Sequence, residues 1–438
     1  MSQKKHFTQE SLRDLFESRI VKSKAVGLDG TRLEGFADRL TAETALISRK
    51  VDTLDYRFTN YREKLISKGA KRFPRQISVP TVRDRLTLRG VCNCLAELAP
   101  EAYGTPPHSH IKAIASLIKD STEPLSFLRV DIRDFFPSID QQRLMSVLKR
   151  LGCEDFLMHL ISGAIRTATG PRIIGMSNEV GVPQGLSISN ILSSIFMKEF
   201  DDQQAPRGFY RRYVDDIIII DRSDLIARRY KEVFAALSSF GLQAHPLGSS
   251  GKTEEKRISE GVDYLGYNLS SKMISVRDSS YQRMFSNLNK VFTTFKYKRK
   301  MEQAVFKLNL RITGCIVDGK RKGWLLFFSQ TEDLSQLGFL DAFVVRQCWR
   351  YGINTKKHEI ARFIKCYHEI RYKGLESGYI PNFDSFELQR KYELIATLTG
   401  TSIAELNTRS VETTDREFKQ LVAREVADLE QDVLGTFS

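Results

Sequence analysis

The chain has 438 residues, of which 41% are hydrophobic and 27% charged, and it carries a formal net charge of +14. This length favours two to four packed subdomains, and the composition excludes a largely disordered chain. No apolar run reaches the roughly 18 residues of a membrane span, and the first residues lack the apolar core of a signal peptide. Six cysteines without metal-ligand spacing predict reduced thiols in a cytoplasmic protein.

The positive charge is unevenly distributed along the chain. Residues 374–438 contain 6 Lys or Arg against 12 Asp or Glu, which leaves a balance of +20 on residues 1–373. A basic body of this kind favours a polyanionic partner such as a nucleic-acid backbone. For the acidic segment three roles stay open: a lid, a surface for homo-oligomerisation, or a contact to a protein partner.

Hydrophobic periodicity predicts mostly helices at residues 7–66, interrupted by a turn at Gly27-Leu28-Asp29-Gly30. A strand is expected at 76–80 and a helix at about 81–98, while His108-Ser109-His110 is predicted to lie in a loop. The middle of the chain is predicted to contain a strand at 125–132, helices at 141–152 and 157–166, a loop at 181–185, a helix at 187–200, a hairpin at 208–220, a helix at 225–240, and strands at 264–267 and 273–276. Residues 280–373 are predicted to be helical and basic, and those from 383 onward helical and acidic.

Three aspartates stand beside apolar strands. Asp131 lies at the end of the strand at 125–132, and Asp215-Asp216 occupy the bend of the predicted hairpin. Phosphoryl transfer depends on positioning and charge neutralisation, which two Mg²⁺ ions about 4 Å apart can provide. Because Mg²⁺ prefers a few carboxylates together with water and substrate phosphates, these residues are candidate metal ligands. Two adjacent aspartates alone are more often a solvated turn.

Several motifs resemble those of reverse transcriptases. Tyr213-Val214-Asp215-Asp216 is similar to the YxDD box, and Asp131 in Asp131-Ile132-Arg133-Asp134-Phe135-Phe136 is similar to the first catalytic aspartate. Further matches are a GxPQGxxxSxxL pattern starting at Gly181, a fingers segment at 75–85, a GxDG element at 27–30 and an FLGY-like primer grip at 264–267. The motifs follow the family's order over residues 25–275, and together they are specific where each alone is weak.

The resemblance implies an α+β right-hand polymerase. Its expected parts are a helical N-terminal region at 1–66, fingers at 67–124, a ferredoxin-like antiparallel palm at 125–275 with fingers elements interleaved around 141–180, a basic helical thumb at 276–373 and an acidic helical extension at 374–438. The thumb would hold a primer–template duplex.

The resemblance also assigns the catalytic residues. Asp131 and Asp215 would bind both metal ions, Asp216 would complete the charge, and the carbonyl of Ile132 would be a further ligand. Mg²⁺ is the expected ion, with Mn²⁺ as an alternative. Lys252 would protonate the pyrophosphate leaving group. Lys256 is the alternative for that role, because the preceding loop is longer than the motif predicts.

Nucleotide-binding residues follow from the same motifs. Phe136 would act as a steric gate against the ribose 2′-hydroxyl, with Phe135 in the core. Gln184 and Gly185 would line the nucleotide pocket. Arg75, helped by Lys71 or Arg72, would bind the triphosphate, although Lys71 and Arg72 could equally lie in a solvated loop.

Contacts to template and primer are expected from residues spread over the chain. Arg83 and Arg85 could touch the template backbone or form salt bridges within the fingers. The other expected contacts come from the motif residues Tyr213, Leu265 and Gly266 and from the thumb residues Lys298 and Arg299.

The implied function is RNA-directed DNA synthesis from dNTPs. The chain lacks a recognisable nuclease cluster and is most similar to defence-associated bacterial enzymes, so the template is expected to be a dedicated noncoding RNA and the role antiphage defence. Four alternatives stay open: a template-independent or protein-primed DNA polymerase, a group II intron-derived or retron-like enzyme, an RNA polymerase, and a non-catalytic RNA-binding protein.

Overall fold

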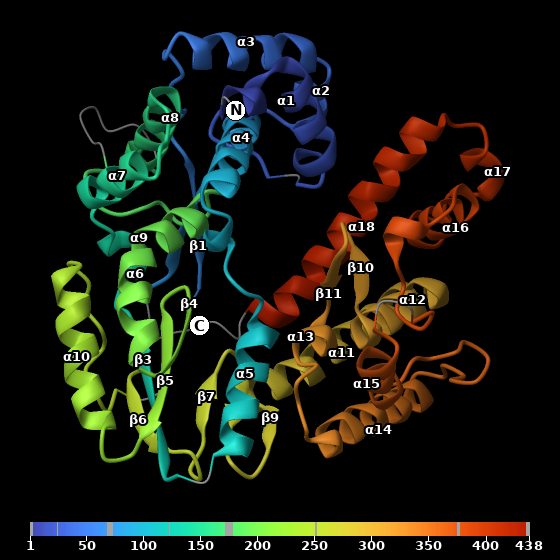
Figure 1. Cartoon of the computed structure of the whole chain (residues 1–438). Helices are drawn as coiled ribbons and strands as arrows, with labels where there is room; N and C mark the ends of the chain where they lie inside the picture. Colours follow the sequence, from blue (N-terminus) through green and yellow to red (C-terminus); the bar gives the residue numbers. More distant parts are fainter. Residues whose placement is uncertain are drawn as a thin grey trace. The chain divides into compact units, whose positions relative to one another are not determined.

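The computed structural model describes residues 3–23, 25–67, 73–121, 123–170, 178–249, 252–374 and 377–434 (Figure 1). The chain forms two compact units. Unit 1 consists of Met1–Thr105 and Glu123–Arg257, and unit 2 of Pro106–Thr122 and Ile258–Ser438. This division differs from the predicted boundaries, because 106–122 was expected in the fingers and 258–275 in the palm.

Unit 1 contains the helices η1 (Gln3–Phe7), α1 (Gln9–Leu15), η2 (Phe16–Ile20), α2 (Leu33–Ala37), α3 (Leu40–Asp52), α4 (Val82–Leu98), η3 (Pro100–Tyr103), α6 (Phe135–Ser138), α7 (Gln141–Arg150), α8 (Asp155–Arg166), α9 (Ser189–Gln204), η4 (Ala205–Arg207) and α10 (Ile226–Ser239). Its strands are β1 (Arg62–Ile66), β2 (Arg75–Val79), β3 (Leu125–Asp131), β4 (Phe209–Tyr213), β5 (Asp216–Arg222) and β6 (Glu254–Arg257).

The main sheet of unit 1 has the strand order β4-β5-β3-β6, and every pair in it is antiparallel. With α9 before β4 and α10 before β6, this is the ferredoxin-like arrangement expected for the palm. Ile217 to Ile220 are all at most 2% exposed, so both faces of β5 are covered. Helix α10 contacts β3, β5 and α9 (Figure 1). The α+β prediction is therefore confirmed.

A second, two-stranded sheet pairs β1 with β2 in antiparallel register. The prediction that residues 62–66 are helical is wrong. All five residues of β1 are exposed, so no buried face imposes the alternation by which a strand is recognised in a sequence. Helix α4 follows β2 and is capped at its start, where the Thr81 hydroxyl accepts from the Asp84 N–H at 3.1 Å.

The loop before α9 is locked against β2. The Ser78 N–H donates to the Gln184 carbonyl at 2.7 Å. Gly185 has a φ of +103°, and a Cβ there would lie 2.6 Å from Ile77 Cγ2 and 2.8 Å from the Ser78 carbonyl oxygen. Gly181, with a φ of +83°, lies equally close to the Pro137 carbonyl. Glycine is therefore required at these positions by backbone conformation and by close approach.

Unit 2 contains the helices α5 (Pro107–Asp120), α11 (Asp278–Lys298), α12 (Met301–Thr313), α13 (Trp324–Phe327), α14 (Leu334–Arg350), α15 (Phe363–Tyr372), η6 (Phe383–Ser385), α16 (Leu388–Thr399), α17 (Ile403–Leu406) and α18 (Val411–Leu434). Its strands are β7 (Val262–Tyr264), β8 (Tyr267–Leu269), β9 (Ile274–Val276), β10 (Cys315–Val317) and β11 (Lys320–Lys322). Strands β7, β8 and β9 form one antiparallel sheet, and β10 pairs with β11.

Three local predictions in unit 2 are wrong. His108-Ser109-His110 is helical and lies in the first turn of α5. Pro107 begins this helix, and proline is favoured there because the first N–H groups of a helix have no partner within it. Tyr264 to Tyr267 is not one strand but a hairpin, whose turn residues Leu265 and Gly266 have φ values of +47° and +80°. The β10–β11 hairpin interrupts a region predicted to be helical throughout, and its three-residue strands are too short to show periodicity.

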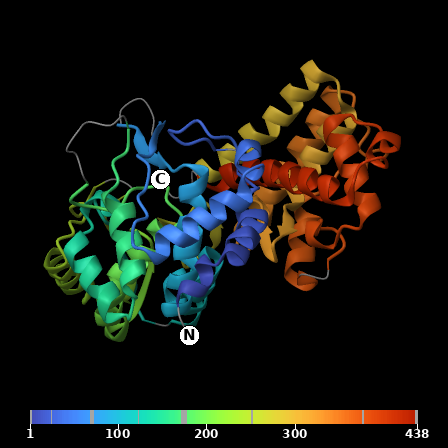
Figure 2. The same cartoon turned by 90° about the horizontal axis from the view of Figure 1, so that it is seen from above.

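The acidic C-terminal segment is helical, as predicted, and its longest helix packs on the basic helices. Helix α18 contacts α11, α13, α16 and β11 (Figures 1 and 2). Ion pairs join Lys307 to Glu425 at 3.0 Å and Arg311 to Asp432 at 3.0 Å. Part of the negative charge of this segment is therefore neutralised by basic side chains of unit 2. Among the described residues, no helix combines the length and the apolar composition needed to cross a bilayer.

We predict that Gly185→Ala lowers the stability of unit 1, because the new methyl group meets backbone at 2.8 Å and φ must stay positive. The expected cost is about 1–3 kcal/mol, measured by thermal or urea unfolding. Gly35→Ala is the control, since Gly35 lies in α2 with nothing within 4 Å of its virtual Cβ. Equal unfolding midpoints for Gly185→Ala and the wild type would contradict the close packing.

Candidate active site

The three aspartates converge at one end of the main sheet. Asp131, the last residue of β3, stands directly opposite Asp216, the first residue of β5. The Ile132 N–H donates to the Asp215 carbonyl at 3.0 Å, which ties the end of β3 to the hairpin bend. Antiparallel pairing of β3 with β5 therefore brings together carboxylates that are 84 or more positions apart in the sequence.

The hairpin bend is a two-residue loop, Val214-Asp215, between β4 and β5. Val214 has a φ of +57°, which is unusual and costly for a β-branched residue. Arg212 holds this loop: its guanidinium donates to the Val214 carbonyl at 2.9 Å and to both carboxylate oxygens of Asp201 at 2.8 and 2.5 Å. Arg212 is therefore a positioning residue for the bend.

Asp216 forms a buried ion pair with Arg129 of β3. Two guanidinium nitrogens donate to the two carboxylate oxygens, each at 2.9 Å. The two side chains are only 9% and 15% exposed. Burial raises the pKa of Asp216, and the charge of Arg129 opposes that rise. A bidentate pair fixes the direction of the carboxylate as well as its charge.

Among the described residues, no cation forms an ion pair with Asp215 as Arg129 does with Asp216. Burial and the negative charges of Asp131 and Asp216 raise its pKa to about 6. The ionised carboxylate is thus disfavoured in the metal-free protein, and a bound cation would relieve the repulsion. The electrostatics of this position therefore fit a metal ion.

Asp131 lies beside two basic side chains, Lys252 and His245. The Lys252 ammonium donates to its two oxygens at 3.1 and 3.0 Å. His245 Nε2 lies 3.4 Å from Asp131 Oδ1. Lys256, the alternative to Lys252, lies in β6 and pairs with Glu254 at 2.9 Å. Of the two lysines, Lys252 is thus the one beside the carboxylates.

The donor set suits Mg²⁺ even though it is not a closed cage. No group of three or more His, Cys, Asp or Glu side chains in the described part of the chain has a spacing that would enclose a metal by itself. Mg²⁺ is commonly held by one or two carboxylates, with the other positions taken by water and substrate phosphates. Asp131 and Asp215 are the two candidate carboxylates for this role, while Asp216 is engaged by Arg129.

Hydrogen bonds connect the segments that carry the residues expected around the nucleotide. Phe136 is half-buried and Phe135 is 3% exposed. The Val182 N–H donates to the Phe136 carbonyl at 2.8 Å, which links Phe136 to the loop that carries Gln184 and Gly185. Arg75 begins β2, which holds that loop. Lys71 and Arg72 lie outside the described residues.

Other expected contacts have different surroundings. The Arg83 guanidinium donates to Glu43 of α3 at 2.5 and 2.9 Å, and Arg85 donates to the carbonyls of Ser23 and Ala25 at 3.1 and 2.8 Å. Both arginines thus join α4 to the N-terminal region: Arg83 through a salt bridge and Arg85 through backbone hydrogen bonds, neither of them within the fingers. Tyr213 stands opposite Asp216 in the hairpin. The remaining template and primer candidates, Leu265, Gly266, Lys298 and Arg299, belong to unit 2.

Sequence reasoning missed Arg129, Arg212 and His245. Arg129 could have been found, because it is a charged residue inside an otherwise apolar strand that leads to an aspartate. Arg212 is also a charged residue in a predicted strand shortly before an aspartate, but this indication was weaker than the one for Arg129. His245 gave none, since its neighbourhood depends on the isolated bridge between Ile132 and Ala244.

Comparisons with known proteins agree with this geometry. The family model "Reverse transcriptase (RNA-dependent DNA polymerase)" matches residues 66–269. Protein YkfC of Escherichia coli (strain K12) is 24% identical over 186 residues, which cover 40% of this chain and 49% of YkfC. Retron Ec86 reverse transcriptase of Escherichia coli is 22% identical over 267 residues, covering 58% of this chain and 76% of that protein.

Solved structures of telomerase also match. That from Candida albicans, in complex with a fragment of telomeric RNA, has a TM-score of 0.46 and 13% identity, covering 91% of this chain and 67% of that chain. Apo telomerase from Candida tropicalis has a TM-score of 0.43 and 14% identity, covering 99% and 84%. The chain spans about half the length of YkfC. The comparisons therefore show a reverse transcriptase domain at residues 66–269, which is somewhat less than half of the chain.

Proposed function

We propose that this protein is an RNA-directed DNA polymerase that adds dNTPs to a primer by two-metal phosphoryl transfer. The convergence of Asp131, Asp215 and Asp216 at one end of the main sheet is the observation that carries the proposal. The match of residues 66–269 to the reverse transcriptase family model supports the reaction type. The intact carboxylates speak against a non-catalytic RNA-binding protein.

The metal ions, when bound, would neutralise the phosphates and stabilise charge on the attacking and leaving oxygens. Asp131 and Asp215 would hold them, with the Ile132 carbonyl as a further ligand, and Mg²⁺ or Mn²⁺ suits such oxygen donors. We assign to Lys252 the donation of a proton to the departing pyrophosphate, and its position 3.0 Å from Asp131 supports this role. Asp216 acts through Arg129, which keeps the hairpin bend in register with β3.

We assign the nucleotide pocket to Phe136, Gln184 and Gly185, with Arg75 for the triphosphate. The hydrogen bonds from Val182 to the Phe136 carbonyl and from Ser78 to the Gln184 carbonyl support this assignment, because they join the loop that carries Gln184 and Gly185 to Phe136 and to β2, the strand that begins with Arg75. Tyr213, Leu265, Gly266, Lys298 and Arg299 remain candidates for contacts with template and primer.

The template is proposed to be a dedicated noncoding RNA, and the cellular role antiphage defence in the cytoplasm. The likeness to a retron reverse transcriptase supports both, as does the basic charge of the first 373 residues. Sequencing the nucleic acid that copurifies with the full chain tests this proposal. One recurrent RNA with matching cDNA is expected, and random cellular RNA without cDNA would contradict it.

We predict that Asp215→Asn and Asp216→Asn separate activity from stability. Asp215→Asn should reduce DNA synthesis by a factor of about 10³ or more, yet raise the melting temperature of the metal-free protein by about 2 °C, because carboxylate repulsion is relieved. Asp216→Asn should lower the melting temperature by about 5 °C or more, since Arg129 loses its buried partner. Primer extension and calorimetry are the measurements.

Asp134→Asn is the matched control for these variants. Asp134 is exposed and has a φ of +43°, a conformation that asparagine also tolerates. Synthesis and melting temperature should stay at wild-type values. Mg²⁺ should raise the melting temperature of the wild type but not of Asp215→Asn. The metal assignment is disproved if Mg²⁺ stabilises both proteins equally.

We also predict that Phe136→Val admits ribonucleotides. A smaller side chain leaves room for the 2′-hydroxyl, so the preference for dNTP over rNTP should fall by a factor of about ten or more. Single-nucleotide incorporation on an RNA template measures this ratio. Phe135→Leu is the control, because that ring is in the core and its loss should reduce stability without changing selection. Unchanged selection in Phe136→Val would remove the gate assignment.

The alternative of a protein-primed or template-independent polymerase has a direct test. A product attached to the protein migrates faster on a gel after protease digestion, whereas a nucleic-acid-primed product does not change. We expect no change in migration and a product sequence complementary to the added RNA. A protease-sensitive product of RNA-independent sequence would favour the alternative.

A further inference from the structure

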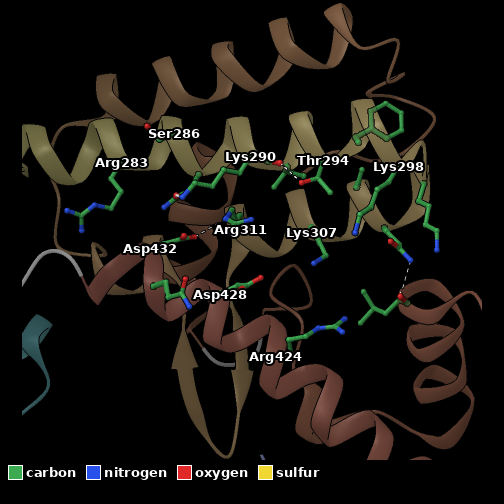
Figure 3. A pocket seen from close by; sticks show the side chains of 18 residues that line it. Arg283, Ser286, Lys290, Thr294, Lys298, Lys307, Arg311, Arg424, Asp428 and Asp432 are labelled. Atoms are coloured by element: carbon green, nitrogen blue, oxygen red, sulfur yellow. Dashed lines mark hydrogen bonds and ion pairs between the residues drawn. The ribbon is translucent and has the colours of Figure 1, made fainter. Parts of the chain in front are cut away.

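Unit 2 contains a cavity of about 700 Å³ between α11, α12 and α18 (Figure 3). Its volume falls within the range of small-molecule sites. Cations from all three helices line it, among them Arg283, Lys298, Lys300, Lys307, Arg311 and Arg424. A cavity with a strongly cationic lining differs from the mostly apolar sites that bind neutral ligands. The lining therefore points to an anion.

The positive charge is concentrated at one end of the cavity. Lys298, Lys307 and Arg424 lie at this end in Figure 3, and Arg283 lies at the opposite end. Glu425, whose side chain is 4% exposed, pairs with Lys307 at 3.0 Å and with Arg424 at 3.2 Å. Within the described part of the chain, no ion pair or hydrogen bond engages the ammonium groups of Lys298 and Lys300. One carboxylate thus faces four cations.

The centre of the cavity is closer to neutral. Arg311 donates to Asp432 at 3.0 Å, and the Lys290 ammonium donates to Asn287 at 2.8 Å. Asp428 adds a second carboxylate to the lining and lies near Asp432 in Figure 3. An anion would therefore be attracted to the end formed by Lys298, Lys300, Lys307 and Arg424, which we name the cationic end.

The lining also limits what kind of anion fits. Phe295 is 5% exposed, so its ring offers no open face on which a base could stack. Several lysines and an arginine around one space are suited to oxygens that carry more than one negative charge, because each ammonium supplies a separate charged donor. Linked phosphates meet this requirement, and a single carboxylate does not.

We infer that the cationic end of this cavity binds a ligand with linked phosphate groups, through the phosphates rather than the base. The ligand would be a nucleoside polyphosphate; a nucleic-acid strand held here would instead be the template and primer contact already proposed for Lys298. The site lies entirely within unit 2 and contains none of the three catalytic aspartates, so it is distinct from the site of nucleotide addition.

The test uses the full chain with Asp215→Asn, in buffer without divalent cations, so that metal-dependent binding at the catalytic site is removed. Inorganic tripolyphosphate is the probe, and isothermal titration calorimetry measures its affinity. Lys298→Ala with Lys300→Ala should weaken binding by about tenfold or more, because two charged contacts to phosphate are lost. Lys296→Ala is the control: it lies on α11 but does not line the cavity, and its affinity should stay within about twofold.

Absence of tripolyphosphate binding at millimolar concentration would overturn the inference, as would an equal loss in Lys296→Ala. Competition then identifies the source of the phosphates. Displacement by dATP and dCTP alike supports a nucleotide, and displacement only by a single-stranded oligonucleotide would overturn the inference. A strong preference for one base would contradict recognition through phosphate. Because no DNA synthesis is measured, absence of tripolyphosphate binding would not contradict the proposed polymerase activity. Likewise, absence of DNA synthesis would not contradict the phosphate site.

Discussion

The active site depends on one constraint: three carboxylates must lie together in a place where they repel one another. The main sheet meets it by burying four consecutive isoleucines in β5 and pairing that strand with β3. Apolar burial of this kind contributes about 25 cal/mol per Å². This burial does not depend on the aspartates, so the register that opposes Asp131 to Asp216 is set by the core and not by the aspartates themselves.

Two arginines then stabilise the carboxylates and the bend that carries them. Arg129 neutralises Asp216 from within the sheet, and Arg212 holds the strained bend through the Val214 carbonyl. Asp215 is left as the carboxylate without a cation of its own, with a pKa raised to about 6. The two aspartates therefore differ in their surroundings: Asp216 is held by an ion pair within the protein, whereas Asp215 is in an environment that a metal ion would stabilise.

Much of this was predictable from the sequence where a strong local signal coincided with a family motif. Strand β3, the β4–β5 hairpin, α4, α7, α8 and α10 lie within a few residues of their expected positions. Exposed or very short strands, such as β1 and β10, left no periodicity to read. The partners of Arg83, Asp216 and Lys252 could not be predicted, because they depend on residues 40, 87 and 121 positions away. Motifs identified the catalytic side chains, while the surrounding charge balance needed the fold.

The discontinuous make-up of unit 2 has a consequence for biogenesis. Helix α5 belongs to that unit but is separated from the rest of it by Glu123–Arg257. Its apolar side, with Ile111 and Ile114 fully buried in the finished protein, leaves the ribosome before the helices of unit 2 exist. At about 5–20 residues per second, this side stays uncovered for many seconds. Nascent-chain chaperones and the pace of translation should therefore affect the yield of this protein more than its equilibrium stability suggests.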